Sequence, residues 1–95
     1  MHFVAICLDK PDSLAKRLEI RAAHLAFLAE KAEMVKLGGP FLDADGKPCG
    51  SMLIVACASE TEAQAFLADD PYAKAGLFAS VELRPYRPVV GASLA

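Results

Sequence analysis

The stretch HFVAICLD, residues 2–9, is rich in β-forming residues and is apolar on both of its alternating faces. A strand with this pattern belongs at the centre of a sheet, where both of its faces are covered. The stretch CGSMLIVACA, residues 49–58, has the same character. We therefore predict two central strands and place the other elements around them.

A long helix and a short strand are predicted between these two segments. Asp12 or Ser13 can cap the helix, because their side-chain oxygens accept a free first-turn N–H. The helix is expected to run from about residue 13 to about residue 36 and to end before Gly38-Gly39-Pro40. Residues 34–43 then predict a strand bent at the glycines, and Asp45-Gly46 indicates a hairpin turn.

A second helix and a last strand follow residue 58. Ser59 or Thr61 can open the helix, and Glu62 stands three residues after Ser59, as in a capping box. The helix is expected to end near Asp69, with one extra turn within PYAKAGL, residues 71–77. FASVELRPY, residues 78–86, predicts the fourth strand, and residues 87–95 predict a tail or a partner-contacting arm.

The predicted order β-α-β-β-α-β is the ferredoxin-like arrangement, an α+β fold with two helices on one face of a four-stranded antiparallel sheet. Both central strands are apolar on both faces, yet the helices can cover only one. A second copy is the simplest cover for the other, so we predict a homodimer with sheets packed face to face. The alternative cover, the tail, is short and polar. The whole chain, 1–95, is predicted to be one domain, with a core over 2–86.

Composition narrows the function classes. The chain has 95 residues, is 55% hydrophobic and carries a net charge of −2, which indicates a globular domain and argues against nucleic-acid binding. We predict no membrane segment and no secretion signal, because the apolar runs are short and the N-terminus lacks a basic region. Cys7, Cys49 and Cys57 form no CxxC pair, so reduced thiols and a cytoplasmic location are expected.

The first predicted helix carries basic side chains in an unusual place. In RLEIRAAHLAFL, residues 17–28, a turn of about 100° per residue puts Arg17, Arg21 and His24 in the middle of an arc bounded by large apolar residues. One interpretation is that the arginine stems pack on the sheet and that the histidine is a core residue. The other is a positively charged pocket for a small anion or an oxyanion.

Such a pocket needs a counter-charge, and Asp69-Asp70-Pro71-Tyr72 offers carboxylates between apolar segments. An aspartate at the C-terminus of a helix is on the unfavourable side of the helix dipole and favours a cationic partner. It can also serve simply to start a turn before proline. A carboxylate bound to one nitrogen of His24 would fix the imidazole tautomer and create a general acid/base.

Several motifs together resemble the YCII-related family. They are R-x-x-H-L at 21–25, the Gly-Gly-Pro turn at 38–40, G-S-x-x-I-V-x-x-x-S at 50–59 and D-P-Y-x-x-A-G-L-F at 70–78. The resemblance covers roughly residues 3–86, and the last motif is the most specific.

The resemblance implies a dimeric α+β barrel similar to the muconolactone isomerase group. It also implies a site in which His24 and Asp70 are the catalytic pair and Arg21 and Ser51 contact the substrate. We add Arg17 and Tyr72 as substrate-binding candidates. Most members of the family have no assigned substrate, and a few relatives catalyse cofactor-free proton-transfer eliminations on small cyclic or chlorinated aromatic metabolites.

Three functions are compatible with these residues. The first is a cofactor-free lyase or isomerase acting on a small anionic cyclic metabolite, and the second is a binding module for such a metabolite without catalysis. A monooxygenase that uses haem or oxygen is a weaker third, because fold alone does not determine function. We predict no metal site, since His2 and His24 are the only histidines, and no phosphate-binding loop or serine nucleophile.

Overall fold

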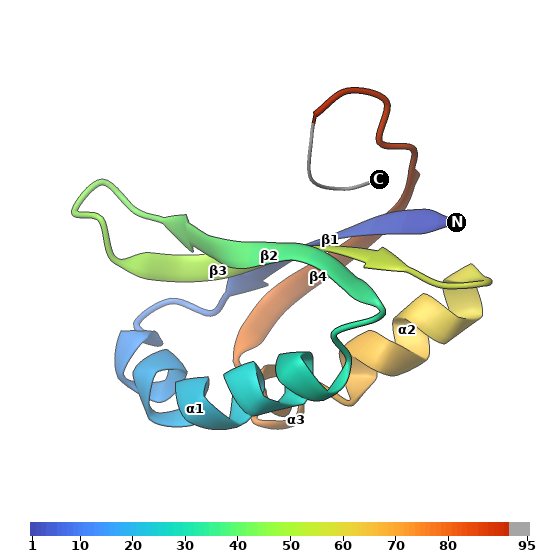
Figure 1. The fold of residues 1–95 in the computed structure, drawn as a ribbon. Coiled ribbons are helices and arrows are strands. Elements are labelled where there is room, and N and C mark those ends of the chain that lie inside the picture. Colours follow the sequence, from blue (N-terminus) through green and yellow to red (C-terminus); the bar gives the residue numbers. More distant parts are fainter. Residues whose placement is uncertain (92–95) are drawn as a thin grey trace.

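The computed structural model describes residues 1–91 and contains one four-stranded sheet with helices on one side of it (Figure 1). In chain order the elements are β1 (His2–Asp9), α1 (Leu14–Glu30), β2 (Val35–Leu42), β3 (Pro48–Ala56), α2 (Glu60–Ala68), α3 (Pro71–Lys74) and β4 (Phe78–Tyr86). The strand order is β2-β3-β1-β4 and every pair is antiparallel. The predicted α+β ferredoxin-like fold is therefore confirmed, with β1 and β3 at its centre.

The core lies between the two central strands and the helices. Phe3, Ala5 and Cys7 of β1 lie opposite Val55, Leu53 and Ser51 of β3, and all six are buried. Phe66 and Leu67 of α2 pack against this layer. Burying each large apolar side chain is worth roughly 1.5–3 kcal/mol, so this layer holds the sheet to its helices.

The first helix ends earlier than the sequence predicts. It stops at Glu30, and a turn follows in which the N–H groups of Met34 and Val35 donate to the carbonyl of Lys31. Val35 is already opposite Val55 of β3. The expectation of helix to residue 36 is wrong because pairing with a distant strand outweighs the local helical preference of this segment.

The two adjacent glycines of β2 neither bend the strand nor form a turn, contrary to the prediction. Gly38 and Gly39 stand opposite Leu53 and Met52 in regular pairing, and the register shifts lie elsewhere in β2. A Cβ atom at Gly38 would lie 2.6 Å from Leu53 Cδ2, whereas at Gly39 it would meet nothing within 4 Å. Gly38 therefore serves the close approach of Leu53 and not a bend.

Asp70 lies between the end of α2, as predicted, and the start of α3, which is the predicted extra turn. Ser59 caps α2 by accepting a hydrogen bond from the Glu62 N–H (3.2 Å), and α2 ends at Ala68. Asp70 then caps α3, because its Oδ1 accepts from the Tyr72 N–H at 2.9 Å. The carboxylate is thus at a helix N-terminus, the favourable side of the dipole.

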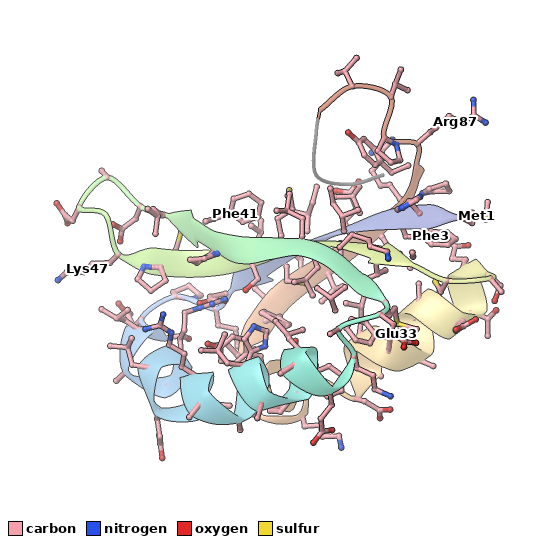
Figure 2. The ribbon with its side chains drawn as sticks, viewed as in Figure 1. Met1, Phe3, Glu33, Phe41, Lys47 and Arg87 are labelled. Atoms are coloured by element: carbon pink, nitrogen blue, oxygen red, sulfur yellow. The ribbon has the colours of Figure 1, made fainter. Side chains whose placement is uncertain are left out.

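The side of the sheet that faces away from the helices has no helix over it (Figure 1). We call it the outer face. It is apolar along β1, β2 and β3, whereas Glu82 and Arg84 of β4 form an exposed ion pair at its edge. Phe41 points to this side in Figure 2, and the strand alternation assigns these residues to it: Val4, Ile6, Leu8, Leu37, Phe41, Met52 and Ile54.

Leu8 and Leu37 of the outer face are exposed. Val89 and Val90 are also exposed, so this part of the predicted tail does not cover the outer face, while residues 92–95 of that tail lie outside the described residues. Across residues 1–91, none of the helices is long and apolar enough to cross a membrane.

Candidate active site

A cavity of about 290 Å³ opens between α1 and the β2–β3 side of the sheet. Side chains with nitrogen atoms lie in this space in Figure 2. Strands β2 and β3 and Tyr72 of α3 line one side, and α1 lines the other with Arg17, Leu18, Arg21, His24, Leu25 and Leu28. The lining is mainly apolar, so polar groups that point into it are few and can determine how a ligand is oriented.

His24 and Asp70 meet beside this cavity. His24 Nδ1 lies 2.8 Å from Asp70 Oδ1 and 3.1 Å from Oδ2, and both side chains are buried. A carboxylate accepts hydrogen bonds, so Nδ1 is the donor in this pair, and in the neutral imidazole with this tautomer Nε2 is the atom that can accept a proton. Within residues 1–91, Nε2 has no hydrogen-bond partner. Every fully buried polar side-chain atom in these residues does have a partner, so Nε2 is not fully buried and is accessible from the cavity that His24 lines.

Tyr72 forms the wall next to this pair. Its ring stacks on the His24 ring with centroids 3.9 Å apart and planes at 16°, and Arg17 Cζ lies 4.6 Å from its centroid. Burial raises the pKa of Tyr72 and outweighs the charge of Arg17, which lowers it. The phenol therefore stays protonated at neutral pH and can donate a hydrogen bond to a ligand.

Arg17 is buried and already paired. Its Nε donates to Asp9 Oδ2 at 2.6 Å, and its Nη2 donates to Asp9 Oδ1 at 2.8 Å and to Ser51 Oγ at 2.9 Å. Burial alone would lower the pKa of Arg17, but the hydrogen bonds and charge of Asp9 raise it. The guanidinium is therefore charged, and its charge is balanced inside the protein.

Asp9 is a site residue that the sequence analysis missed. It continues the inward alternation of Phe3, Ala5 and Cys7 along β1, and this periodicity was the signal that could have identified it. The sequence predicted a carboxylate partner for the arginines only around Asp70, but in the structure Asp70 pairs with His24.

Arg21 lines the same cavity but is exposed. Among residues 1–91 no carboxylate forms an ion pair with it. Five of the six predicted site residues thus line one cavity, and Asp70 lies behind His24. Leu18 and Leu25, two of the large apolar residues beside the basic ones on α1, are half exposed at the cavity.

The three cysteines are free thiols. Cys7 is buried behind the site, and burial together with the charge of Asp70 raises its pKa to about 12. Such a thiol is not a nucleophile at neutral pH. In the described part of the chain, no three side chains of the metal-binding types gather into a cluster.

The fold and this site define a class, the ferredoxin-like α+β domains with a cavity between the first helix and the sheet. The sequence matches the model of the YCII-related domain over residues 1–87, and the chain belongs to the YCII-related family. The resemblance found in its motifs is thereby confirmed.

Two individual relatives and one further solved structure are similar to this chain. The chain is 35% identical over 97 residues to protein YciI of Escherichia coli O6:H1, covering 94% of this chain and 99% of that one. It is 37% identical to 5-chloro-2-hydroxyhydroquinone dehydrochlorinase of Burkholderia phenoliruptrix AC1100, solved with 2,5-dihydroxybenzoquinone, with a TM-score of 0.87 over 92% of this chain and 94% of that one. A NIPSNAP family protein of Agrobacterium tumefaciens, 20% identical with a TM-score of 0.60 over 99% and 97% of the two chains, shares the fold alone.

Proposed function

We propose that the protein is a cofactor-independent enzyme of the lyase or isomerase type, acting on a small anionic cyclic metabolite. The observation that carries this proposal is His24, whose Nδ1 is held by a buried carboxylate while Nε2 opens to a cavity. The similar dehydrochlorinase, a lyase-type enzyme bound to a hydroxyquinone, supports the substrate class.

The chemistry follows from the geometry. Nε2 of His24 takes a proton from a carbon atom next to a carbonyl group, and the electrons of the broken C–H bond form an enolate. The Asp70 carboxylate stabilises the resulting imidazolium, and Arg21 and Tyr72 stabilise the enolate oxygen. Arg17, oriented by Ser51, donates a hydrogen bond to a neutral oxygen of the substrate. In a lyase the enolate expels a leaving group with its bonding electrons, and in an isomerase the imidazolium returns the proton to another atom.

The direct test is turnover of 5-chloro-2-hydroxyhydroquinone, followed by chloride release. We expect His24→Ala to fold and bind but to lose about 10²–10⁴-fold in rate, as general acid–base catalysis predicts. Asp70→Asn should lose activity while keeping α3, because asparagine also caps helices well. Glu30→Ala, at the exposed end of the same helix, is the matched control and should keep the wild-type rate. Wild-type turnover in His24→Ala would refute the catalytic role.

A binding module without catalysis is the second candidate, and the exposed, unpaired Arg21 favours it. In this case the ligand is recovered chemically unchanged, and Arg21→Ala weakens binding more than His24→Ala does. Recovery of an altered ligand would exclude this candidate as a complete account.

We also propose that residues 1–95 form one domain that assembles as a homodimer through the outer face. The exposed Leu8 and Leu37 there support this, since isolated domains seldom leave such a face open. Sedimentation velocity should give a dimer for the wild type and a monomer for Ile6→Glu, and a monomeric wild type would refute the assembly. Three free cysteines fit a reducing compartment, so we place the protein in the cytoplasm.

A further inference from the structure

We propose that the cavity selects ring ligands with a single negative charge, and that Asp9 sets this selectivity by cancelling the charge of Arg17. This inference rests on the proposed function and deepens it, because it defines the charge and orientation of the substrate. Asp9 acts through Arg17 and is therefore a positioning residue.

One end of the cavity, at Arg17, carries no net charge. The Arg17–Asp9 pair is bidentate, and its side chains are only 4% and 5% exposed, so little solvent separates the two charges. The bonds to Asp9 and Ser51 use Nε and Nη2. Within residues 1–91 no fully buried polar side-chain atom is unpaired, so Nη1 is open to the cavity that Arg17 lines. Arg17 can thus donate hydrogen bonds to a ligand, while the Arg17–Asp9 pair as a whole carries no net charge. Such a donor suits a carbonyl or hydroxyl oxygen.

The other end of the cavity, at Arg21, carries a positive charge. Arg21 is one helical turn further along α1, lines the same cavity and is exposed, so it lies at the mouth. The cavity holds one cation without a carboxylate partner in the described chain, because Asp9 pairs with Arg17 and Asp70 pairs with His24. An ionised ligand oxygen is therefore bound at Arg21, and a neutral oxygen at Arg17.

The size of the cavity limits the size of the ligand. The cavity volume of about 290 Å³ is at the lower end of the range of roughly 300–1,000 Å³ for small-molecule sites, which suits a single substituted ring. The ligand class is thus a single ring that carries one ionised and one neutral oxygen.

The test compares three single-ring probes at pH 7 by calorimetry in chloride-free buffer: neutral hydroquinone, monoanionic 4-hydroxybenzoate and dianionic terephthalate. The wild type should bind 4-hydroxybenzoate more tightly than the other two. Asp9→Asn should raise the affinity for terephthalate relative to 4-hydroxybenzoate at least tenfold, because the buried guanidinium is then uncompensated. Arg21→Gln should weaken 4-hydroxybenzoate at least fivefold and leave hydroquinone unchanged.

Asp12→Asn is the matched control, since Asp12 is an exposed carboxylate three residues from Asp9 that does not contact Arg17. It should leave the ratio of affinities unchanged. The double variant D9N/R17M removes both charges and should keep the wild-type preference, which also covers the case that Asp9→Asn does not fold.

Four results would overturn the proposal: no binding of any probe to the wild type, an unchanged ratio in Asp9→Asn, the same change in Asp12→Asn, or a terephthalate preference in the double variant. The ratios are measured without turnover. A failure of this selectivity is therefore distinct from a failure of the catalytic test on His24.

Discussion

Replacing Arg17 with methionine should destabilise the protein by about 3 kcal/mol, because it leaves the Asp9 carboxylate buried without its cation. The pair is joined by hydrogen bonds of 2.6 Å and 2.8 Å where both side chains are almost fully buried. Breaking a buried pair from one side typically costs about 3–5 kcal/mol, and methionine keeps the packing of the stem. Asp9 also borders a second hollow near Lys10 and Asp12, through which water can reach it, so we expect the lower end of this range.

The assay is urea unfolding followed by circular dichroism at a fixed protein concentration. For a domain of this size, a loss of about 3 kcal/mol lowers the melting temperature by about 12–24 °C. In a double-mutant cycle, Asp9→Asn in the Arg17→Met background should recover about 2 kcal/mol, since the unpaired carboxylate is removed. A loss below about 1 kcal/mol in Arg17→Met, or strictly additive effects in the cycle, would refute the reasoning about a buried, balanced pair.

Three further predictions follow from packing, capping and burial. Gly38→Ala should lower both stability and 4-hydroxybenzoate affinity, because its Cβ would lie 2.6 Å from a leucine methyl that borders the cavity, whereas Gly39→Ala, with nothing within 4 Å, should cause neither change. Ser59→Ala should cost about 1 kcal/mol in urea unfolding because it removes the cap of α2, and an equal loss in Thr61→Ala, inside the helix, would contradict this. The Cys7 thiol has its pKa raised from 9.0 to about 12, so the native state favours the protonated thiol and loses stability between these two pH values. The stability of the wild type relative to Cys7→Ala should therefore fall above pH 9, by at most about 1.4 kcal/mol per pH unit, and a constant difference would rule this out.

The strands were predictable because each carries its own pattern. Residues 2–9 and 49–58 show the apolar character of central strands. They form β1 and β3, respectively, and the bounds of each strand lie within two residues of those expected. The end of α1 was not predictable in the same way. Residues 31–36 have the local composition of a helix, and only their pairing with β3, a contact distant in sequence, turns them into a bend and the start of β2.

The site residues were likewise predictable only where a single helix or strand determines their position. The helical projection placed Arg17 and His24 on the inner face of α1 because that face depends on the period of one helix. Asp9 was missed because its role depends on a contact between the end of β1 and the first turn of α1. Asp70 follows the end of α2 as expected, and the predicted extra turn within residues 71–77 is α3, which Asp70 caps; this capping role is the part that the sequence analysis did not include.

Asp70 uses one oxygen atom both to begin α3 and to hold His24. The orientation of the imidazole is therefore set when the chain folds, and no loop has to close around a ligand to create it. In the proposed enzyme this preorganisation removes an entropic cost from each catalytic cycle. The pair in the free protein is already arranged as the proton transfer needs it.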